Sequence, residues 1–568
     1  MANIPWLIIS VFLLFGSHRP CKSQEANEQG DWRIIPRLSV GATYSDNISL
    51  APADEINSDI VLQVEPGVSI HKQGGRINLR LDYAAQGLLY TNNGDANKVN
   101  NNLLAFGTAE LYQKSLFIDA YSSITQVPIS SQGRVDVGNL GLNSGNLNGG
   151  SLLNFNNLNS ILPNADDLFN PIGIFSNIAL TDNQTTQFNF GISPYWRQTF
   201  GGWAEMLLRY RYADVSYSSS DNSTDQLSGL SDSQINTIEF NLASGARSNV
   251  LRWNLNYFYQ QQDNQQNDTQ DIGNNREELL TGEMKYSFNR AWTLLSKAGY
   301  ANNQSSTYED NVNGPYWGLG VAWLPNRFYS LAGLYGLNFN EVTVQINPLL
   351  NNDPVTGHTD RQRTHLQISR AYQGVGYNPG VYWNGSFNHR TRNSNWSATY
   401  IQEVTTAQQL AINSLIVGPD GNPIDLDEQG QILNPDGPFG QNSQQFLRKY
   451  FNINASYLRG PHTLGLNAFS DNREFQDPTL DQDNYGVGVT WIWRFAPRTA
   501  SFFGTGWEHD VLSNDQQNNY WVSVIGLARI FTPDSGGLIS YRYYQNDGDP
   551  SSESFRENRL NIRFNMKF

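Results

Sequence analysis

Apolar and polar residues alternate strictly along the last stretch of the chain, residues 558–568. The apolar positions are Leu560, Ile562, Phe564, Met566 and Phe568, and the polar positions between them are Arg559, Asn561, Arg563, Asn565 and Lys567. A period of two is the side-chain period of a β-strand. A strand with one apolar face and one polar face suits a wall that has lipid on one side and water on the other. We therefore predict a membrane-spanning strand at this end of the chain.

The same alternation recurs far from the C-terminus. It is found in residues 76–83, 203–212, 251–260 and 485–495. A single strand of this kind also fits the solvated sheet of a soluble protein. Its recurrence along the whole chain instead favours a closed antiparallel wall in a membrane.

Short polar turns alternate with longer polar segments between the expected strands. The turns are predicted at residues 71–75, 113–115, 198–201, 245–249, 289–291, 325–327, 391–394, 460–461, 496–499 and 531–536, and the longest intervening loops at 127–186, 340–380 and 405–444. Bacterial outer-membrane barrels have short periplasmic turns and longer outer loops. The fold prediction is therefore an all-β, transmembrane antiparallel β-barrel of outer-membrane type, with about 22 strands (20–24) and both ends in the periplasm. Residues 364–372 fit either a further strand or a hairpin within a loop.

The closing strand carries a second signal of this fold class. Such strands end on an aromatic residue that serves as an assembly signal, and we assign that role to Phe564 and Phe568. The expected partners are outer-membrane lipid and the barrel-assembly machinery, together with polysaccharide or periplasmic export components.

The N-terminus indicates export. An apolar run spans residues 6–15 and a small-residue cleavage site follows at Ser23, which predicts a signal peptide over 1–23, a linker over 24–31 and the barrel over 32–568. The single cysteine, Cys21, is then removed, which suits an oxidising compartment. Lipidation of Cys21 is the alternative, but residues 18–20 lack the small side chains expected just before a lipidated cysteine. The predicted location is the outer membrane.

Composition agrees with a wide barrel. A chain of 568 residues exceeds the roughly 250–300 residues that one hydrophobic core supports, whereas a barrel has no central core to fill. Aromatic residues make up 12% of the chain and can supply the two interfacial girdles, while polar loops and lumen lower the mean hydropathy to −0.49. The formal net charge of −15 argues against a nucleic-acid partner.

Charged residues on the inward phase of the strands are the most functional-looking feature. The candidate lumen charges are Arg80, Arg209, Arg211, Arg252, Arg494 and Arg563. Further charges on the same phase are Arg76, Arg559, Lys567, Asp82, Glu205, Glu283 and Lys285. Guanidinium groups along a wet lumen attract anions and can bind carboxylated sugars bidentately. The alternative is a lattice of ion pairs that stiffens the wall.

No motif indicates an enzyme. The histidines are scattered without metal-ligand spacing, and no Gly-x-Ser-x-Gly turn is present. An acidic cluster, with Asp420, Asp425, Asp427, Glu428 and Asp436, fits a solvated pair of turns, with a Ca²⁺ site as the alternative. The apolar half of the first long loop, residues 152–180, either folds into the lumen or packs outside the barrel. We expect no catalytic residue, no metal and no cofactor.

Several short stretches in order along the chain resemble one family. They are residues 44–48 (Tyr-Ser-Asp-Asn-Ile), 66–68 with 81–83, 193–195 with 210–212, 308–310, 316–325, 389–392, 396–400, 541–543 and 556–558. The chain resembles the outer-membrane β-barrels associated with the PEP-CTERM/exosortase system, which accompany exopolysaccharide gene clusters. The resemblance implies an outer-membrane barrel that assists export or surface attachment of polysaccharide. A general porin or solute channel, an outer-membrane enzyme and a structural or adhesive barrel are the alternatives. The long loops 127–186 and 340–380 depart from the family pattern.

Overall fold

The structure is a computed structural model built almost entirely from strands. The described residues are 32–72, 74–128, 178–180, 184–218, 232–264, 274–305, 313–325, 329–346, 351–352, 359–360, 363–376, 380–406, 409–410, 445–511, 516–549 and 554–568. Within them no helix is long and apolar enough to cross a membrane.

The strands follow one another with few other elements between them. They are β1 (Trp32–Ser45), β2 (Asp59–Lys72), β3 (Ile77–Tyr90), β4 (Lys98–Tyr112), β5 (Leu116–Pro128), β6 (Gln184–Phe200), β7 (Ala204–Tyr217), β8 (Ser233–Ser244), β9 (Leu251–Asn264), β10 (Asn275–Ser287), β11 (Trp292–Ser305), β12 (Gly314–Trp323), β13 (Tyr329–Gly336), β14 (Phe339–Ile346), β15 (Asn351–Asn352), β16 (Thr359–Asp360), β17 (Arg363–Gln373), β18 (Gly380–Arg390), β19 (Ser394–Thr405), β20 (Phe446–Arg459), β21 (His462–Phe475), β22 (Gln482–Ala496), β23 (Thr499–Val511), β24 (Gln517–Thr532), β25 (Ser535–Asp549) and β26 (Phe555–Lys567). Two short 3-10 helices, η2 (Gly94–Ala96) and η3 (Pro478–Leu480), lie in loops.

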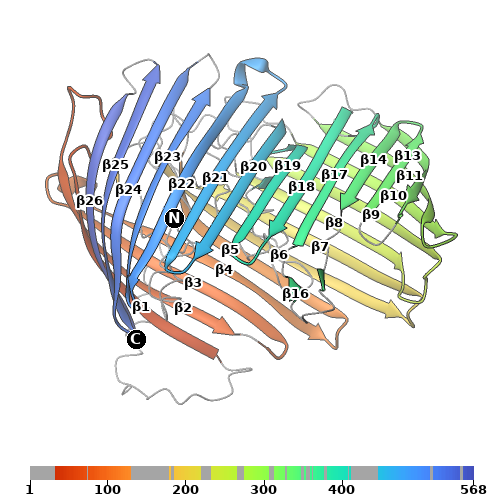
Figure 1. Ribbon diagram of the computed structural model, residues 1–568, viewed down its shortest axis with the longest axis horizontal. Coiled ribbons are helices and arrows are strands. Elements are labelled where there is room, and N and C mark those ends of the chain that lie inside the picture. The colour runs from red at the N-terminus through yellow and green to blue at the C-terminus, as the bar shows by residue number, and fades with distance from the viewer. Residues whose placement is uncertain are drawn as a thin grey trace.

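These strands form one closed barrel. A single 24-stranded sheet contains every strand except β15 and β16, which pair with each other. Each strand of the sheet is antiparallel to its neighbours along the chain, and β1 closes the cylinder by pairing with β26. Closure leaves no free sheet edge, which is the condition for a sheet to span a membrane. Figure 1 shows the inclined strands wrapping around a common axis. The predicted all-β antiparallel barrel is confirmed.

The two ends of the barrel differ. One end, called the turn end below, carries the start of β1, the end of β26 and the short connections such as 113–115 and 460–461. The other, the loop end, carries the long connections from β5 to β6 and from β19 to β20. The predicted short turns fall between consecutive strands, except that β6 continues to Phe200 and moves its turn to residues 201–203. In barrels of this type the turn end faces the periplasm.

The strand number of 24 is at the upper limit of the predicted range of about 20–24. The central estimate of about 22 counted residues 340–380 as one long loop, whereas the structure places β14 and β17 there. These strands pair with each other and with β13 and β18, so residues 364–372 belong to a wall strand. β14 has only eight residues, and Asn340, Thr364 and Arg370 interrupt the apolar outward phase of the two strands, which made the alternation hard to recognise.

The β13–β14 hairpin turns on a residue with a left-handed backbone. Gly336 pairs with Phe339, so Leu337 and Asn338 alone form the turn, and Asn338 has φ of 53°. Asparagine tolerates this conformation better than a branched residue does. The Asn338 Nδ2 also donates to the Pro315 carbonyl at 3.1 Å.

We expect Asn338→Val to lower the free energy of unfolding by about 1–2 kcal/mol more than Asn338→Gly. Both variants lose the hydrogen bond to Pro315, so their difference isolates the backbone effect. Guanidinium unfolding in detergent, followed by tryptophan fluorescence, measures it. Equal unfolding midpoints for the two variants would contradict the assignment of strain to the positive φ.

The wall has the reverse polarity of a soluble protein. On β26 the outward Leu560, Ile562 and Phe564 are exposed, whereas the inward Arg559 and Arg563 are buried. Outward apolar residues recur on β22, where Val487, Val489, Trp491 and Trp493 are exposed. An apolar exterior of this kind is stable only against lipid.

A short described piece of the first long loop lies against the inner wall at the loop end. Ile178 and Ala179 are buried, and the Tyr90 hydroxyl donates to the Ile178 carbonyl at 2.9 Å. The Leu180 N–H donates to the Ile48 carbonyl at 2.9 Å. These residues lie inside the barrel mouth, and residues 152–177 lie outside the described part of the chain.

Candidate functional site

The predicted lumen arginines all lie on the inward face, in two groups. Arg80, Arg209, Arg211 and Arg563 form ion pairs within the wall. Arg252 and Arg494 lie near the turn end and are exposed. The sequence pattern therefore placed these residues on the polar phase of their strands. The two groups differ in burial and in their neighbouring side chains.

The first group includes a cluster on β5 to β8. The Arg209 Nη2 lies 3.7 Å from Asp119 Oδ2, and its guanidinium lies 4.7 Å from the centre of the Tyr195 ring. On the same strand, the Arg211 Nη2 lies 3.3 Å from Glu239 Oε1. These contacts tie consecutive strands together across the inner surface.

A second cluster crosses the place where the barrel closes. Arg563 on β26 reaches across β1 to β2, where its Nη2 lies 3.3 Å from Glu65 Oε2 and donates to Gln63 Oε1 at 2.8 Å. The side chains of Arg563 and Glu65 are 0% and 2% exposed. The two opposite charges stay in contact because either one, buried without the other, would cost several kcal/mol, the usual cost of breaking a buried ion pair.

Sequence reasoning missed a third cluster, on β20 and β21. Arg448 donates to both carboxylate oxygens of Asp471, at 2.9 and 2.8 Å, and Arg473 lies 3.6 Å from the same carboxylate. Bidentate pairs of this kind are the strongest arginine contacts. All three residues lie on the polar phase of their strands, so the same alternation that identified the other arginines could have found them.

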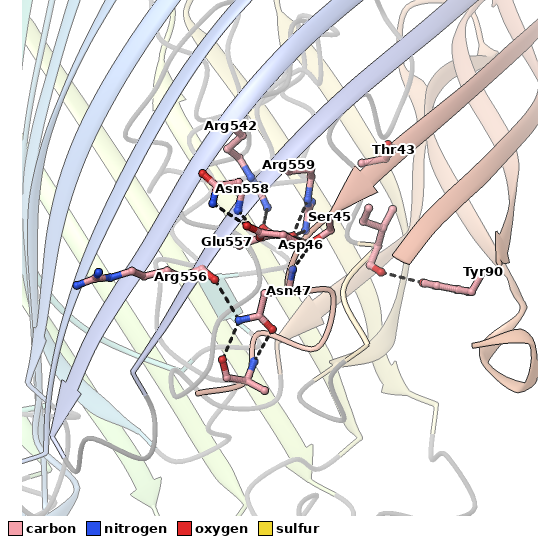
Figure 2. A network of polar contacts seen from close by, with 12 residues as sticks. Thr43, Ser45, Asp46, Asn47, Tyr90, Arg542, Arg556, Glu557, Asn558 and Arg559 are labelled. Atoms are coloured by element: carbon pink, nitrogen blue, oxygen red, sulfur yellow. Dashed lines mark hydrogen bonds and ion pairs between the residues drawn. The ribbon is translucent and has the colours of Figure 1, made fainter. Parts of the chain in front are cut away.

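A further set of polar contacts surrounds Glu557 at the loop end of the β1–β26 seam. Its carboxylate accepts from Ser45 Oγ at 2.6 Å, from Arg559 Nη2 at 2.7 Å and from Arg542 Nη2 at 3.0 Å. Figure 2 shows these groups converging from β1, β25 and β26. The contacts join the first strand of the barrel to the last two.

Beside Glu557, the segment that follows β1 continues these contacts. The Asp46 carboxylate accepts from the Asn558 backbone N–H and from Asn558 Nδ2, both at 2.7 Å. Asn47 donates from Nδ2 to the carbonyls of Ala51 at 2.7 Å and Arg556 at 3.0 Å, and its Oδ1 accepts from the Ala51 N–H at 3.0 Å. We call residues 45–47 with 556–559 the seam latch (Figure 2).

The paired arginines fit the stiffening alternative of the sequence analysis. Each already has a carboxylate within the wall, so its charge is offset locally and contributes little to the field in the bore. The exposed Arg252, near the turn end, has no such carboxylate among the described residues and is available to attract anions.

The accessible part of the inner wall is made mostly of uncharged polar side chains. On β8, β9, β14 and β17 to β19, half-buried or exposed inward positions are Asn241, Asn254, Asn256, Gln260, Thr343, Gln367, Ser369, Asn384, Ser386, Asn388, Ser397 and Thr399. Several bond to one another, as when Asn241 Nδ2 donates to Asn254 Oδ1 at 3.1 Å and Thr343 Oγ1 to Ser369 Oγ at 3.1 Å. Carboxylates such as Glu239 and Glu341 are interspersed. Amides and hydroxyls both donate and accept, so this wall can bind polyhydroxylated molecules.

The described histidines do not gather into a site. His462 stacks on Trp491 and Trp493 on the outer face, with ring centres 5.9 Å apart in each case, and His509 contacts Asn519 at 2.9 Å. In the described part of the chain, no group of three or more histidine or acidic residues could hold a metal ion. The acidic cluster at residues 420–436 lies outside the described residues.

The predicted assembly residues lie at the seam. Phe564 faces outward and stacks on Phe531, with ring centres 6.1 Å apart. Phe568 is exposed and its backbone N–H donates to the Pro36 carbonyl of β1 at 3.0 Å. The final residue therefore extends the β26 pairing with the first strand.

No protein-family model and no curated relative matches the sequence. Among solved structures, the chain is similar to the siderophore receptor PirA from Pseudomonas aeruginosa, with 8% identity, a TM-score of 0.41 and coverage of 95% of this chain and 81% of the receptor. It is also similar to the FrpB iron transporter from Neisseria meningitidis, in its F3-3 variant, with 10% identity, a TM-score of 0.45 and coverage of 96% and 82%. Structural similarity at such low sequence identity and TM-score does not indicate what the chain binds.

Proposed function

We propose that the protein is an outer-membrane barrel that assists the passage or surface attachment of a polysaccharide. The accessible inner wall carries the proposal, since it presents the amide and hydroxyl groups that bind sugar hydroxyls. No step in this role needs a catalytic residue or a cofactor.

The width of the barrel supports this role. Barrels of about 8 strands are filled by their own side chains, whereas those of about 16–18 strands enclose an aqueous channel. A 24-stranded wall encloses a bore wider still. Such a bore is wide enough for a hydrated polymer chain.

Rigid walls suit the same task. The ion-pair clusters on β5 to β8, on β20 and β21, and across the seam hold the inner surface in one shape. A wall that offers many weak, similar contacts lets a polymer advance without a deep binding minimum, as conduction requires of any channel.

The family resemblance points in the same direction. The stretches shared with PEP-CTERM/exosortase-associated barrels support a place beside an exopolysaccharide system, after export to the outer membrane through the signal peptide. A general porin is the main rival, and a solely structural or adhesive barrel is the next.

Deletion of the gene tests the cellular role. We expect less released and surface-attached polysaccharide and more retained in the periplasm, measured in fractionated cells. Complementation with the wild-type gene is the control. Equal amounts in the three fractions of the deletion strain and its parent would contradict the export role.

A reconstituted channel tests the wall itself. We expect dextran fragments to block the current of the purified protein in planar bilayers. Asn256→Leu with Asn384→Leu should weaken that block about thirtyfold, because the loss of each amide's contact with the sugar costs about 1 kcal/mol. The matched control, Asn256→Gln with Asn384→Gln, keeps both amides and should retain the block. Equal block of the leucine and glutamine variants would exclude sugar contacts by these side chains.

A further inference from the structure

Exposed charges at the turn end are almost all basic. They are Arg33, Arg76, Lys114, Arg197, Arg247, Arg252, Lys285, Arg290, Arg390, Arg392, Arg459, Arg494, Arg498 and Arg529. Among the side chains that the structure describes at this end, the exposed acidic residues are Glu205 and Asp534. The whole chain carries a net charge of −15, so the exposed charges described at this end are opposite in sign to the protein as a whole.

A subset of these residues forms what we call the basic collar: Arg33, Arg76, Arg197, Arg252, Lys285, Arg390 and Arg494. Each lies on, or directly before, an inward-facing strand position next to a turn. They come from β1, β3, β6, β9, β10, β18 and β22, which are spread around the barrel. The collar therefore encircles the periplasmic mouth of the bore.

One place in the collar sets like charges opposite each other. Arg252 and Lys285 are direct cross-strand partners on β9 and β10. Like charges in these positions destabilise a sheet. An anion bound between the two side chains would offset that cost.

Four members of the collar differ from the arginines deeper in the wall. Within the described part of the chain, Arg76, Arg252, Lys285 and Arg390 have no carboxylate at ion-pair distance, whereas Arg209, Arg211 and Arg563 each have one. Unpaired guanidinium and ammonium groups around a low-dielectric mouth focus the field and raise the local concentration of anions.

At the loop end, by contrast, described arginines of the inner wall are paired. Arg448 and Arg473 contact Asp471, and Arg542 and Arg559 contact Glu557. The accessible positive charge of the described wall therefore lies mainly at the periplasmic mouth, which favours entry of a polyanion from the periplasm.

We propose that the basic collar recruits an anionic polysaccharide, one that carries carboxylates along its chain, from the periplasmic side. This inference rests on the proposed function and deepens it by naming the substrate class and the side of entry. Arginine suits the task because its planar fork binds a carboxylate bidentately.

The test uses the whole protein in planar bilayers. Its orientation is read from the side on which an impermeant thiol reagent labels Gln113→Cys, in the exposed β4–β5 turn. Oligogalacturonate and dextran fragments of equal length are added to either side. We expect oligogalacturonate to block at about tenfold lower concentration from the turn side than from the loop side, an effect that raised salt removes.

Matched variants separate the collar from general charge. Arg252→Gln with Lys285→Gln should abolish most of the preference for the turn side. Arg459→Gln with Arg529→Gln removes the same charge from the outward face of the same end and should leave the preference intact. Equal losses in the two pairs would overturn the proposal.

The remaining outcomes are distinct. Dextran block without any sidedness for oligogalacturonate would refute the collar and leave the proposed function standing, whereas the absence of block by either sugar would refute both. Block from the turn side by polyglutamate but not by oligogalacturonate would also overturn the proposal, in favour of an acidic protein partner.

Discussion

Replacement of Arg563 by Met is expected to lower the free energy of unfolding by about 3–5 kcal/mol, since it leaves the Glu65 carboxylate buried without the guanidinium group that contacts it. Glu65 is 2% exposed and lies 3.3 Å from the guanidinium. Methionine fills a similar volume, so the loss measured is electrostatic rather than a cavity. Guanidinium unfolding in detergent, followed by far-UV circular dichroism, gives the difference.

The double variant Arg563→Met with Glu65→Leu is the control. Removal of both charges eliminates the unpaired carboxylate, and well-packed apolar replacements of buried ion pairs are often neutral in stability. The double variant should therefore recover most of the loss. If it unfolds as easily as Arg563→Met, the single variant acts through packing and the ion-pair explanation is wrong.

The alternation that predicted the barrel succeeded because the membrane imposes it on almost every strand. Residues 485–495 and 558–568 need an apolar outward face along their whole length, so their sequence records the orientation of each side chain. The inward placement of Arg209 and Arg563 followed from the same rule. The carboxylate partner of each arginine could not be predicted in this way. Asp119 and Glu65 lie on other strands, and a local sequence pattern does not determine the register between strands.

The short strands show where the rule loses force. β13 and β14 have eight residues each, which leaves few outward positions to display an apolar face. Their two-residue turn at Asn338 also lacks the usual Asn-Gly or Asp-Gly pair, because Leu337 precedes the asparagine. From sequence alone, a hairpin of this kind cannot be distinguished from a polar loop.

The basic collar was visible only in part from sequence. Arg76, Arg252 and Arg494 were placed on the inward phase, beside predicted short turns of one end of the barrel. Arg197 and Arg390 lie just before turns. The alternation of apolar and polar residues ends there, so the sequence does not show whether these arginines belong to a strand or to a loop. The opposition of Arg252 and Lys285 is a property of the β9–β10 register, which the structure alone supplies.

Substitution of Asn47 by Ala should weaken the seam latch and lower the free energy of unfolding by about 2–4 kcal/mol, the sum of its lost hydrogen bonds. Asn47 bonds to Arg556 across the seam and to Ala51 within its own turn. The seam pairs strands from opposite ends of the chain: Thr43 and Asn561, which contact each other across it, are 518 positions apart. The other paired strands are neighbours along the chain. Loop-closure entropy opposes this pairing more than any hairpin, so its side-chain contacts matter most.

A disulfide across the seam separates the latch from the turn that follows β1. Ala42 and Ile562 are cross-strand partners on β1 and β26, and Ala42→Cys with Ile562→Cys can link them. If Asn47 acts by holding the seam, the oxidised pair should restore the stability of Asn47→Ala, and reduction should abolish the rescue. A loss that persists in the oxidised protein would assign the effect to the Ala51 contacts alone. Asn289→Ala, which removes the caps of the β10–β11 turn at Ala291 and Trp292, should be insensitive to the same disulfide because its hairpin does not depend on barrel closure.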